Sequence, residues 1–458
     1  MPWTQVTENR YQRAIGENER FIKAIGDRAH AVGREHWSVT AYGTFTLHEN
    51  VKRSSADVTA WLRQAWQVLR FQHPSIASTA SDEILEYVVP AAQELEEWTR
   101  DTFTVVHDGT VDDVVASIKP SPFVTAYYLP HRSQIILHLA HWRTDGYGAL
   151  QLLNAFFESC TALSTTKVEA LPWGTEVERL VPSVEEALAN PVESTEEIHA
   201  AARKYLATTA NIPGAVGVSQ TTELSTPPSG TRSARLRLST ETTEAISEAC
   251  DARGISVLAA VHASTAATTY ELAHPDAKQK HYTSTMRFSL RPYLPEQYRN
   301  PSVAAGIYTG GYMAKVPATQ SWLDNAKLYT REYDTGVTDD FLISRRQYAR
   351  DVFERMKTPP PPPVTPPSEI DISSVDDATK LVHPWHGTSD GKLEVNEVSV
   401  GVETLTRQMY CFVWMFRGSL ELSVVYNQAF YEGGFVKGAV ERVARVLEGN
   451  LGLVFGFE

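Results

Sequence analysis

Cysteine is scarce in this sequence of 458 residues, which contains only Cys160, Cys250 and Cys411. The three are widely separated, odd in number and include no CxxC pair. This pattern argues against a disulfide framework and against a zinc-ribbon site. We therefore expect a protein of the reducing cytosol.

Long apolar runs are absent too: no stretch approaches the ~20 apolar residues of a membrane span, and the N-terminal segment lacks the apolar core of a signal peptide. Basic residues are in deficit, with 42 Lys and Arg against 55 Asp and Glu, which gives a net charge of −13. Such a charge opposes broad contact with nucleic acid or an anionic membrane. We expect a cytoplasmic monomer with neither of these as a partner.

The signatures of several site classes are missing as well. The chain has no GxxxxGK[ST] phosphate loop, no GxSxG nucleophile elbow and no HExxH metal motif. Gly146 and Gly148 lack the third glycine of a dinucleotide fingerprint. The histidine pairs in HLAH (138–141) and HPWH (383–386) have no carboxylate or cysteine at ligand spacing. We therefore expect no metal.

The length is sufficient for two domains, because single cores stop growing beyond roughly 250–300 residues. Residues 209–233 lose helical and strand periodicity and gather Pro, Gly, Ser and Thr. We interpret them as a linker between an N-terminal lobe, 1–208, and a C-terminal lobe, 234–458. Each half mixes strands with helices, which predicts an α/β fold built as a duplicated α+β sandwich.

Local patterns predict particular elements in each half. A capping box at Ser54 and Asp57 begins a helix that ends before Pro74. FVTAYYLP (123–130) and SQIILHLAH (133–141) predict a hairpin, and residues 411–430 predict another around Arg417-Gly418-Ser419.

Two further segments have unusual composition. The proline-rich segment 357–367 predicts a loop or a polyproline II excursion. A basic run, SRRQYAR (344–350), is interpreted as a solvated helix face in preference to a phosphate clamp.

The motif HxxxDG, formed by His141, Asp145 and Gly146, lies where a predicted strand turns into a helix. A neutral imidazole at His141 can accept a proton from a hydroxyl or amine and return it to a leaving thiolate. The alternative is a histidine satisfied at a strand end. Asp145 either orients His141 or faces away and pairs with a cation, and Gly146 would provide backbone freedom beside a substrate.

Three further stretches join HxxxDG in the order and spacing of one family: FSLRPYLP (288–295), residues 400–423 and YNQAFYE (426–432). With AWQVLRFQHPSIAS (65–78), the chain resembles the fungal trichothecene 15-O-acetyltransferase group over nearly its whole length. More widely, it is similar to the BAHD acyltransferases and to the condensation domains of peptide synthetases.

The resemblance implies two lobes like chloramphenicol acetyltransferase with a tunnel between them. It implies that acyl-CoA and a small-molecule acceptor enter from opposite faces and that His141 is the general base. Asp145 would be structural and paired with Arg291 in the LRP segment. The residues that contact the cofactor stay unassigned.

Three features depart from the wider superfamily. Ala140 replaces the first of the two adjacent histidines of condensation domains, which favours a stand-alone acyltransferase. The DFGWG segment of the plant enzymes is absent. SSVDDATK (373–380) occupies a stretch where the resemblance leads us to expect a glycine.

The leading hypothesis is an acyl-CoA-dependent O-acyltransferase, using acetyl-CoA or another acyl-CoA and no metal, that modifies a hydroxyl of a terpenoid or polyketide secondary metabolite. A second hypothesis keeps the fold but uses the tunnel for a cyclisation or isomerisation. A third is a non-catalytic docking module, which the acidic charge disfavours for an acidic carrier partner.

Overall fold

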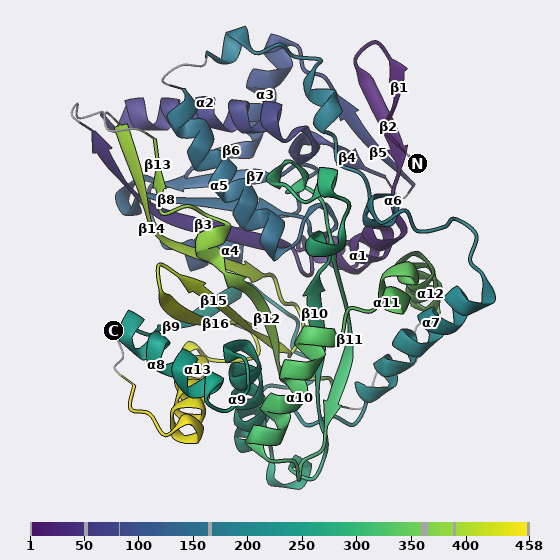
Figure 1. Ribbon diagram of the computed structural model, residues 1–458. Helices are drawn as coiled ribbons and strands as arrows, with labels where there is room; N and C mark the ends of the chain where they lie inside the picture. Colours follow the sequence, from purple (N-terminus) through teal and green to yellow (C-terminus); the bar gives the residue numbers. More distant parts are fainter. Residues whose placement is uncertain are drawn as a thin grey trace.

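The computed structural model describes residues 2–49, 54–81, 83–163, 167–358, 365–387 and 391–455 (Figure 1). It confirms the mixed α/β fold in two lobes. The main sheet of the N-terminal lobe has six strands, in the order β13 (Trp385–His386), β14 (Gly391–Val402), β3 (Val39–Glu49), β8 (Gln134–Leu139), β7 (Thr125–Leu129) and β6 (Phe103–Val105). The predicted hairpin of 123–141 corresponds to β7 and β8, which pair antiparallel.

The helices of this lobe begin where the sequence provides caps. For α2 the Ser54 hydroxyl accepts a hydrogen bond from the Asp57 amide at 3.2 Å, and the Asp57 carboxylate accepts from the Ser54 amide at 3.1 Å, as predicted. The helices are α1 (Glu17–Asp27), α2 (Ser55–Gln72), α3 (Ala92–Thr102), α4 (Val111–Ser117), α5 (Gly146–Ala162), α6 (Val184–Ala187) and α7 (Glu196–Ala207). A smaller sheet adds β1 (Thr4–Thr7), β2 (Arg10–Ala14), β5 (Ile84–Val88) and β4 (Thr79–Ala80).

The C-terminal lobe is built on a four-stranded sheet in the order β12 (Ile370–Asp377), β15 (Met409–Phe416), β16 (Ser419–Asn427) and β9 (Thr231–Arg237). The predicted β15–β16 hairpin turns at Arg417 and Gly418, both with positive φ (53° and 82°), as a tight two-residue turn requires. A two-stranded ribbon, β10 (Tyr282–Ser289) and β11 (Thr309–Val316), extends beside this sheet. The helices are α8 (Thr240–Asp251), α9 (Val257–Leu272), α10 (Trp322–Thr335), α11 (Asp339–Ile343), α12 (Arg345–Lys357) and α13 (Gly433–Leu451).

Alternation along β15 assigns its two faces to two cores. Met409, Cys411 and Val413 belong to the core of the C-terminal lobe. Tyr410 and Phe412 belong to the core of the N-terminal lobe, together with residues of β3, β8 and α5. Because strand side chains alternate between faces, one strand joins both cores and the lobes share a continuous apolar seam.

Two strands lie on the other side of the lobe boundary that was expected at 209–233. β13 and β14 come from the C-terminal half of the sequence but lie in the N-terminal sheet, where β14 pairs antiparallel with β3 over its whole length (Figure 1). The expected linker itself begins within a 3-10 turn, Thr208–Asn211, and ends within β9.

The cysteines, the helices and the proline-rich segment bear on three further expectations from the sequence. The three cysteines are buried and form no disulfide. In the described ranges, no helix is both long and apolar enough to cross a membrane. Residues 359–364, most of the proline-rich segment, lie outside the described residues.

Candidate active site

His141 lies at the junction between β8 and α5. It opens a short 3-10 turn, His141–Arg143, and its Nδ1 is 2.9 Å from the carbonyl oxygen of Thr144. A carbonyl oxygen only accepts hydrogen bonds, so Nδ1 carries the proton. Nε2 then holds a lone pair, and it has no partner among the described residues. The local backbone therefore selects the tautomer whose Nε2 can accept a proton.

A cavity of 1090 Å³ lies in front of this histidine, between the lobes. His141 and Tyr147 line it from the N-terminal lobe. Arg287, Asp371 and Tyr410 line it from the C-terminal lobe. Because each lobe contributes one wall, the cavity exists only when both lobes are assembled.

Burial lowers the pKa of His141, and the charge of Arg287 lowers it further, against opposing effects of Asp145 and of the hydrogen bond to Thr144. A lower pKa keeps the imidazole neutral at pH 7. His141 is therefore in the protonation state that accepts a proton.

Asp145 faces away from His141. Its Oδ1 accepts from the amide of Gly148 at 2.9 Å, which caps α5, and its Oδ2 accepts from the amide of Tyr308 at 2.8 Å. Arg291 Nη2 lies 3.2 and 3.3 Å from the two carboxylate oxygens. Of the two roles left open by the sequence, the structure places Asp145 in the cation pair and not on the imidazole.

Arg291 links this pair to the C-terminal lobe. Its guanidinium also donates to the carbonyl oxygens of Val303 at 3.2 Å and Gly306 at 2.9 Å. Both charged side chains are nearly buried, with 10% of Arg291 and 6% of Asp145 exposed. Removing one would leave an uncompensated charge between the lobes, so the pair holds the His141 turn against the opposite wall.

Close packing in this turn requires a glycine at Gly148, and Gly146 lines the cavity. Gly146 opens α5 with an ordinary φ, and a Cβ there would touch Val375 at 3.1 Å. At Gly148 a Cβ would collide with the carbonyl oxygen of Ala304 and would lie 2.6 Å from Arg291 Nη2. α5 approaches the C-terminal lobe so closely that position 148 has no room for a side chain.

No protein-family model matches the chain. It is 52% identical over 455 residues to acetyltransferase pigO of Monascus ruber, covering 99% of each protein. It is 30% identical over 462 residues to O-acetyltransferase pigM of Monascus ruber, covering 98% of this chain and 87% of that one. The chain belongs to this fungal acetyltransferase family.

Among solved structures, the acetyltransferase is similar to TRI3, a trichothecene 15-O-acetyltransferase from Fusarium sporotrichioides. The TM-score is 0.79 at 15% sequence identity, covering 97% of each chain. This likeness confirms the two-lobed fold that the sequence led us to expect.

In the acetyltransferase, the stretch SSVDDATK replaces the expected glycine with a strained aspartate. β12 carries a register shift between Ser374 and Asp376, and Asp376 adopts a φ of 53°. Its carboxylate accepts a hydrogen bond from the hydroxyl of Tyr147, across the cavity wall. Aspartate is one of the few residues that tolerate this left-handed conformation.

The basic run 344–350 is not a solvated helix face, so that interpretation was wrong. Arg345 is buried against the ring of Phe341, with its guanidinium carbon 4.2 Å from the ring centroid. Arg346 and Arg350 both bind Glu17 of α1, at 2.8 Å. The sequence did not indicate these ion pairs, because Glu17 lies more than 300 residues from both arginines.

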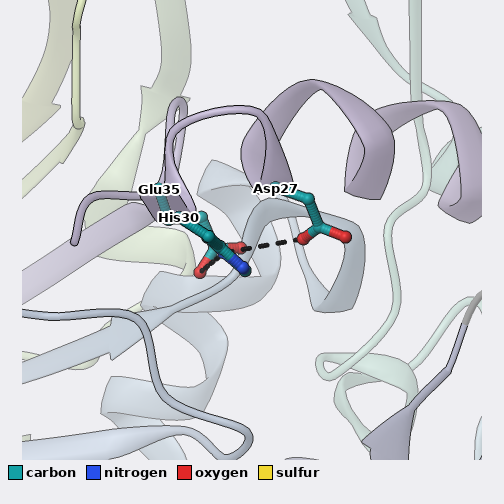
Figure 2. A group of neighbouring side chains, drawn as sticks. All are labelled: Asp27, His30 and Glu35. Carbon is teal, nitrogen blue, oxygen red and sulfur yellow. Dashed lines mark ion pairs between the residues drawn. The ribbon is translucent and has the colours of Figure 1, made fainter. Parts of the chain in front are cut away.

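The histidine pairs of HLAH and HPWH belong to no group of three potential metal ligands in the described part of the chain. A group that the sequence did not indicate is formed by Asp27, His30 and Glu35, whose side chains face one another (Figure 2). His30 Nε2 lies 3.5 Å from Asp27 and 3.8 Å from Glu35. Lys23 also binds Asp27, at 2.5 Å, so the group is a local ion-pair cluster.

Sequence reasoning missed two aromatic residues of the cavity. Trp37 Nε1 donates a hydrogen bond to the hydroxyl of Tyr410 at 3.0 Å, and Trp37 has a φ of 66°. Trp37 lies outside the stretches named above, and nothing in the stretch 400–423 marks Tyr410 as a cavity residue. No sequence pattern predicts a left-handed backbone at a tryptophan.

Proposed function

We propose that this acetyltransferase transfers an acetyl group from acetyl-CoA to a hydroxyl of a polyketide or terpenoid secondary metabolite, with His141 as the general base. The observation that carries the proposal is the orientation of His141. Its Nδ1 proton is committed to Thr144, and Nε2 has no protein partner in the described chain. The relative named as an O-acetyltransferase supports oxygen as the acceptor atom.

The reaction then follows from ordinary acyl-transfer chemistry. Nε2 of His141 takes the acceptor hydroxyl proton as the oxygen attacks the thioester carbonyl carbon. The tetrahedral intermediate collapses with cleavage of the C–S bond, and protonated His141 returns the proton to the thiolate. Acid–base catalysis of this kind contributes roughly 10²–10⁴-fold. Holding both substrates in one cavity supplies a further entropic advantage.

Asp145 and Arg291 act in this scheme by fixing the turn. Their ion pair, together with the Asp145 bond to the Gly148 amide, anchors the start of α5 immediately after His141. The carboxylate touches neither nitrogen of the imidazole in the described contacts. Its role is therefore to position the base and not to exchange protons with it.

Two arginines near the cavity support CoA as the acyl donor. Arg28 donates only to the Met356 carbonyl oxygen, at 3.1 Å, and Arg355 only to the Thr209 hydroxyl, at 3.4 Å. Both line the cavity, and neither pairs with a carboxylate among the described residues. Arg355 also lines an adjoining cavity of 1600 Å³ that contains Lys280. Cations without acidic partners suit the phosphates of CoA.

The test is the release of free thiol from acetyl-CoA by the purified protein, with and without polyhydroxylated polyketide and terpenoid acceptors. We expect slow hydrolysis without an acceptor, faster release with a matching acceptor, and loss of both in His141→Ala. His30→Ala is the control, because it removes a histidine with neighbouring carboxylates outside the cavity. Equal thiol release by His141→Ala and wild type would contradict the mechanism.

A further inference from the structure

The tryptophan beside the base is held in a strained conformation. Trp37 lies two residues before β3, and its neighbour His36 is close enough to His141 for the charge of His141 to lower the His36 pKa. Both residues line the cavity. The φ of 66° at Trp37 lies in the left-handed region, which is sterically disfavoured for a bulky L-residue. Strain of this kind persists where the surroundings fix a side chain, and it clusters at functional sites.

In this backbone conformation, Trp37 makes a hydrogen bond with Tyr410. The indole N–H of Trp37 donates to the Tyr410 hydroxyl oxygen at 3.0 Å. An indole can only donate, so the tyrosine oxygen is the acceptor and its own O–H must point elsewhere. No described residue accepts from it. Tyr410 is 3% exposed and lines the cavity, so its hydroxyl proton is a buried donor without an acceptor among the described residues.

Tyr410 lies next to an ion pair on the wall of the cavity. The guanidinium carbon of Arg287 lies 5.5 Å from the ring centroid of Tyr410. Asp371 holds that guanidinium at 2.7 Å, so the cation does not move away. The same arginine is close enough to lower the pKa of His141. The base, the cation and the unused hydroxyl therefore converge on one part of the cavity.

We propose that the Tyr410 hydroxyl donates a hydrogen bond to the thioester carbonyl oxygen and stabilises the oxyanion of the tetrahedral intermediate, with Trp37 as a positioning residue. This inference rests on the acyl transfer proposed above. When the acceptor oxygen bonds to the carbonyl carbon, the C=O electron pair moves to the oxygen that faces Tyr410. When the C–S bond breaks, that pair re-forms the carbonyl and the thiolate takes the proton from His141. Tyr410 keeps its own proton throughout.

The experiment compares Tyr410→Phe with wild type in the hydrolysis of acetyl-CoA, measured as thiol release. The variant keeps the ring and loses the donor. We expect kcat to fall by about 10²–10³-fold, the effect typical of losing one oxyanion donor. The KM for acetyl-CoA and the pH dependence should be unchanged, because His141 still acts as the base.

Two further variants separate donation from structural support. Trp37→Phe should lower kcat by a smaller factor, and the double variant should be no slower than Tyr410→Phe alone, since Trp37 acts only through that hydroxyl. Tyr431→Phe is the matched control: its hydroxyl donates to the Arg407 carbonyl oxygen at 2.6 Å in the same lobe, and it does not line the cavity. It should retain the wild-type kcat.

Normal kcat in Tyr410→Phe while His141→Ala is inactive would overturn the role of Tyr410 and leave the proposed function standing. Equal losses in Tyr410→Phe and Tyr431→Phe, each with a lower melting temperature, would also overturn it in favour of a structural role. Absence of thiol release from wild type under every condition would overturn the proposed function and this inference together.

Discussion

His30 and His141 each lie within four residues of an aspartate, but their surroundings shift their pKa values in opposite directions. At His30 the carboxylates of Asp27 and Glu35 face the imidazole (Figure 2), and the interaction with Glu35 raises its pKa. At His141 the aspartate is turned toward Arg291, a carbonyl oxygen holds Nδ1, and burial lowers the pKa. Neighbouring carboxylates raise the pKa of a histidine, whereas burial lowers it and favours the neutral imidazole.

The largest expected effect is on catalysis. His141→Ala should lower kcat for thiol release by roughly 10²–10⁴-fold, because it removes the proposed proton acceptor. His30→Ala should leave kcat unchanged. Both variants should show wild-type circular dichroism. A comparable loss in His30→Ala would break the distinction between the two sites.

The next effect concerns stability. Arg291→Ala should reduce the free energy of unfolding by about 3–5 kcal/mol, because it leaves the buried Asp145 carboxylate without its cation. Asp27→Ala, which breaks a partly exposed cluster, should cost no more than about 1 kcal/mol. Urea denaturation of both variants measures the difference. Equal midpoints would show that burial does not separate the two ion pairs.

A smaller effect distinguishes the two glycines after Asp145. Gly148→Ala should destabilise the protein by about 1–3 kcal/mol and lower activity, because its Cβ meets the backbone of Ala304 and the Arg291 guanidinium. Gly146→Ala meets only the side chains of Val375 and Val400 and should be tolerated better. Thermal melting and thiol release report both properties. The reverse ranking would refute the packing argument.

The smallest effect is the pH dependence of stability. The unfolded pKa of histidine is about 6.5. The pKa of His141 is lowered in the folded protein. Its contribution to the free energy of unfolding is therefore fully present above the unfolded pKa and is lost as the pH falls through the folded pKa. The pKa of His30 is raised in the folded protein. Its contribution to the free energy of unfolding is therefore fully present below the unfolded pKa and is lost as the pH rises through the folded pKa.

Melting temperatures between about pH 5 and 8 test these opposite signs. The difference between wild type and His141→Ala should grow as the pH rises. The difference between wild type and His30→Ala should shrink. Parallel curves for the two variants would contradict the assigned protonation states.

Local signals in the sequence predicted the local structure. The cap at Ser54, the hairpin at Arg417 and Gly418, and the strand-to-helix turn at His141 each depend on a few consecutive residues. The features that escaped prediction depend on residues far apart in the chain. The need for glycine at Gly148 comes from Ala304, and no sequence rule places a left-handed backbone at a tryptophan.

The pairing of β14 with β3 has a consequence for synthesis of the chain. Asn396 and Thr46, which bond across these strands, are separated by 350 residues. A ribosome adding ~5–20 residues per second takes roughly 20–70 s to cover that distance. Through this interval the nascent chain exposes an apolar strand edge that nothing yet covers. We expect chaperone engagement of the emerging chain, and poor solubility of any truncated chain that ends before residue 391.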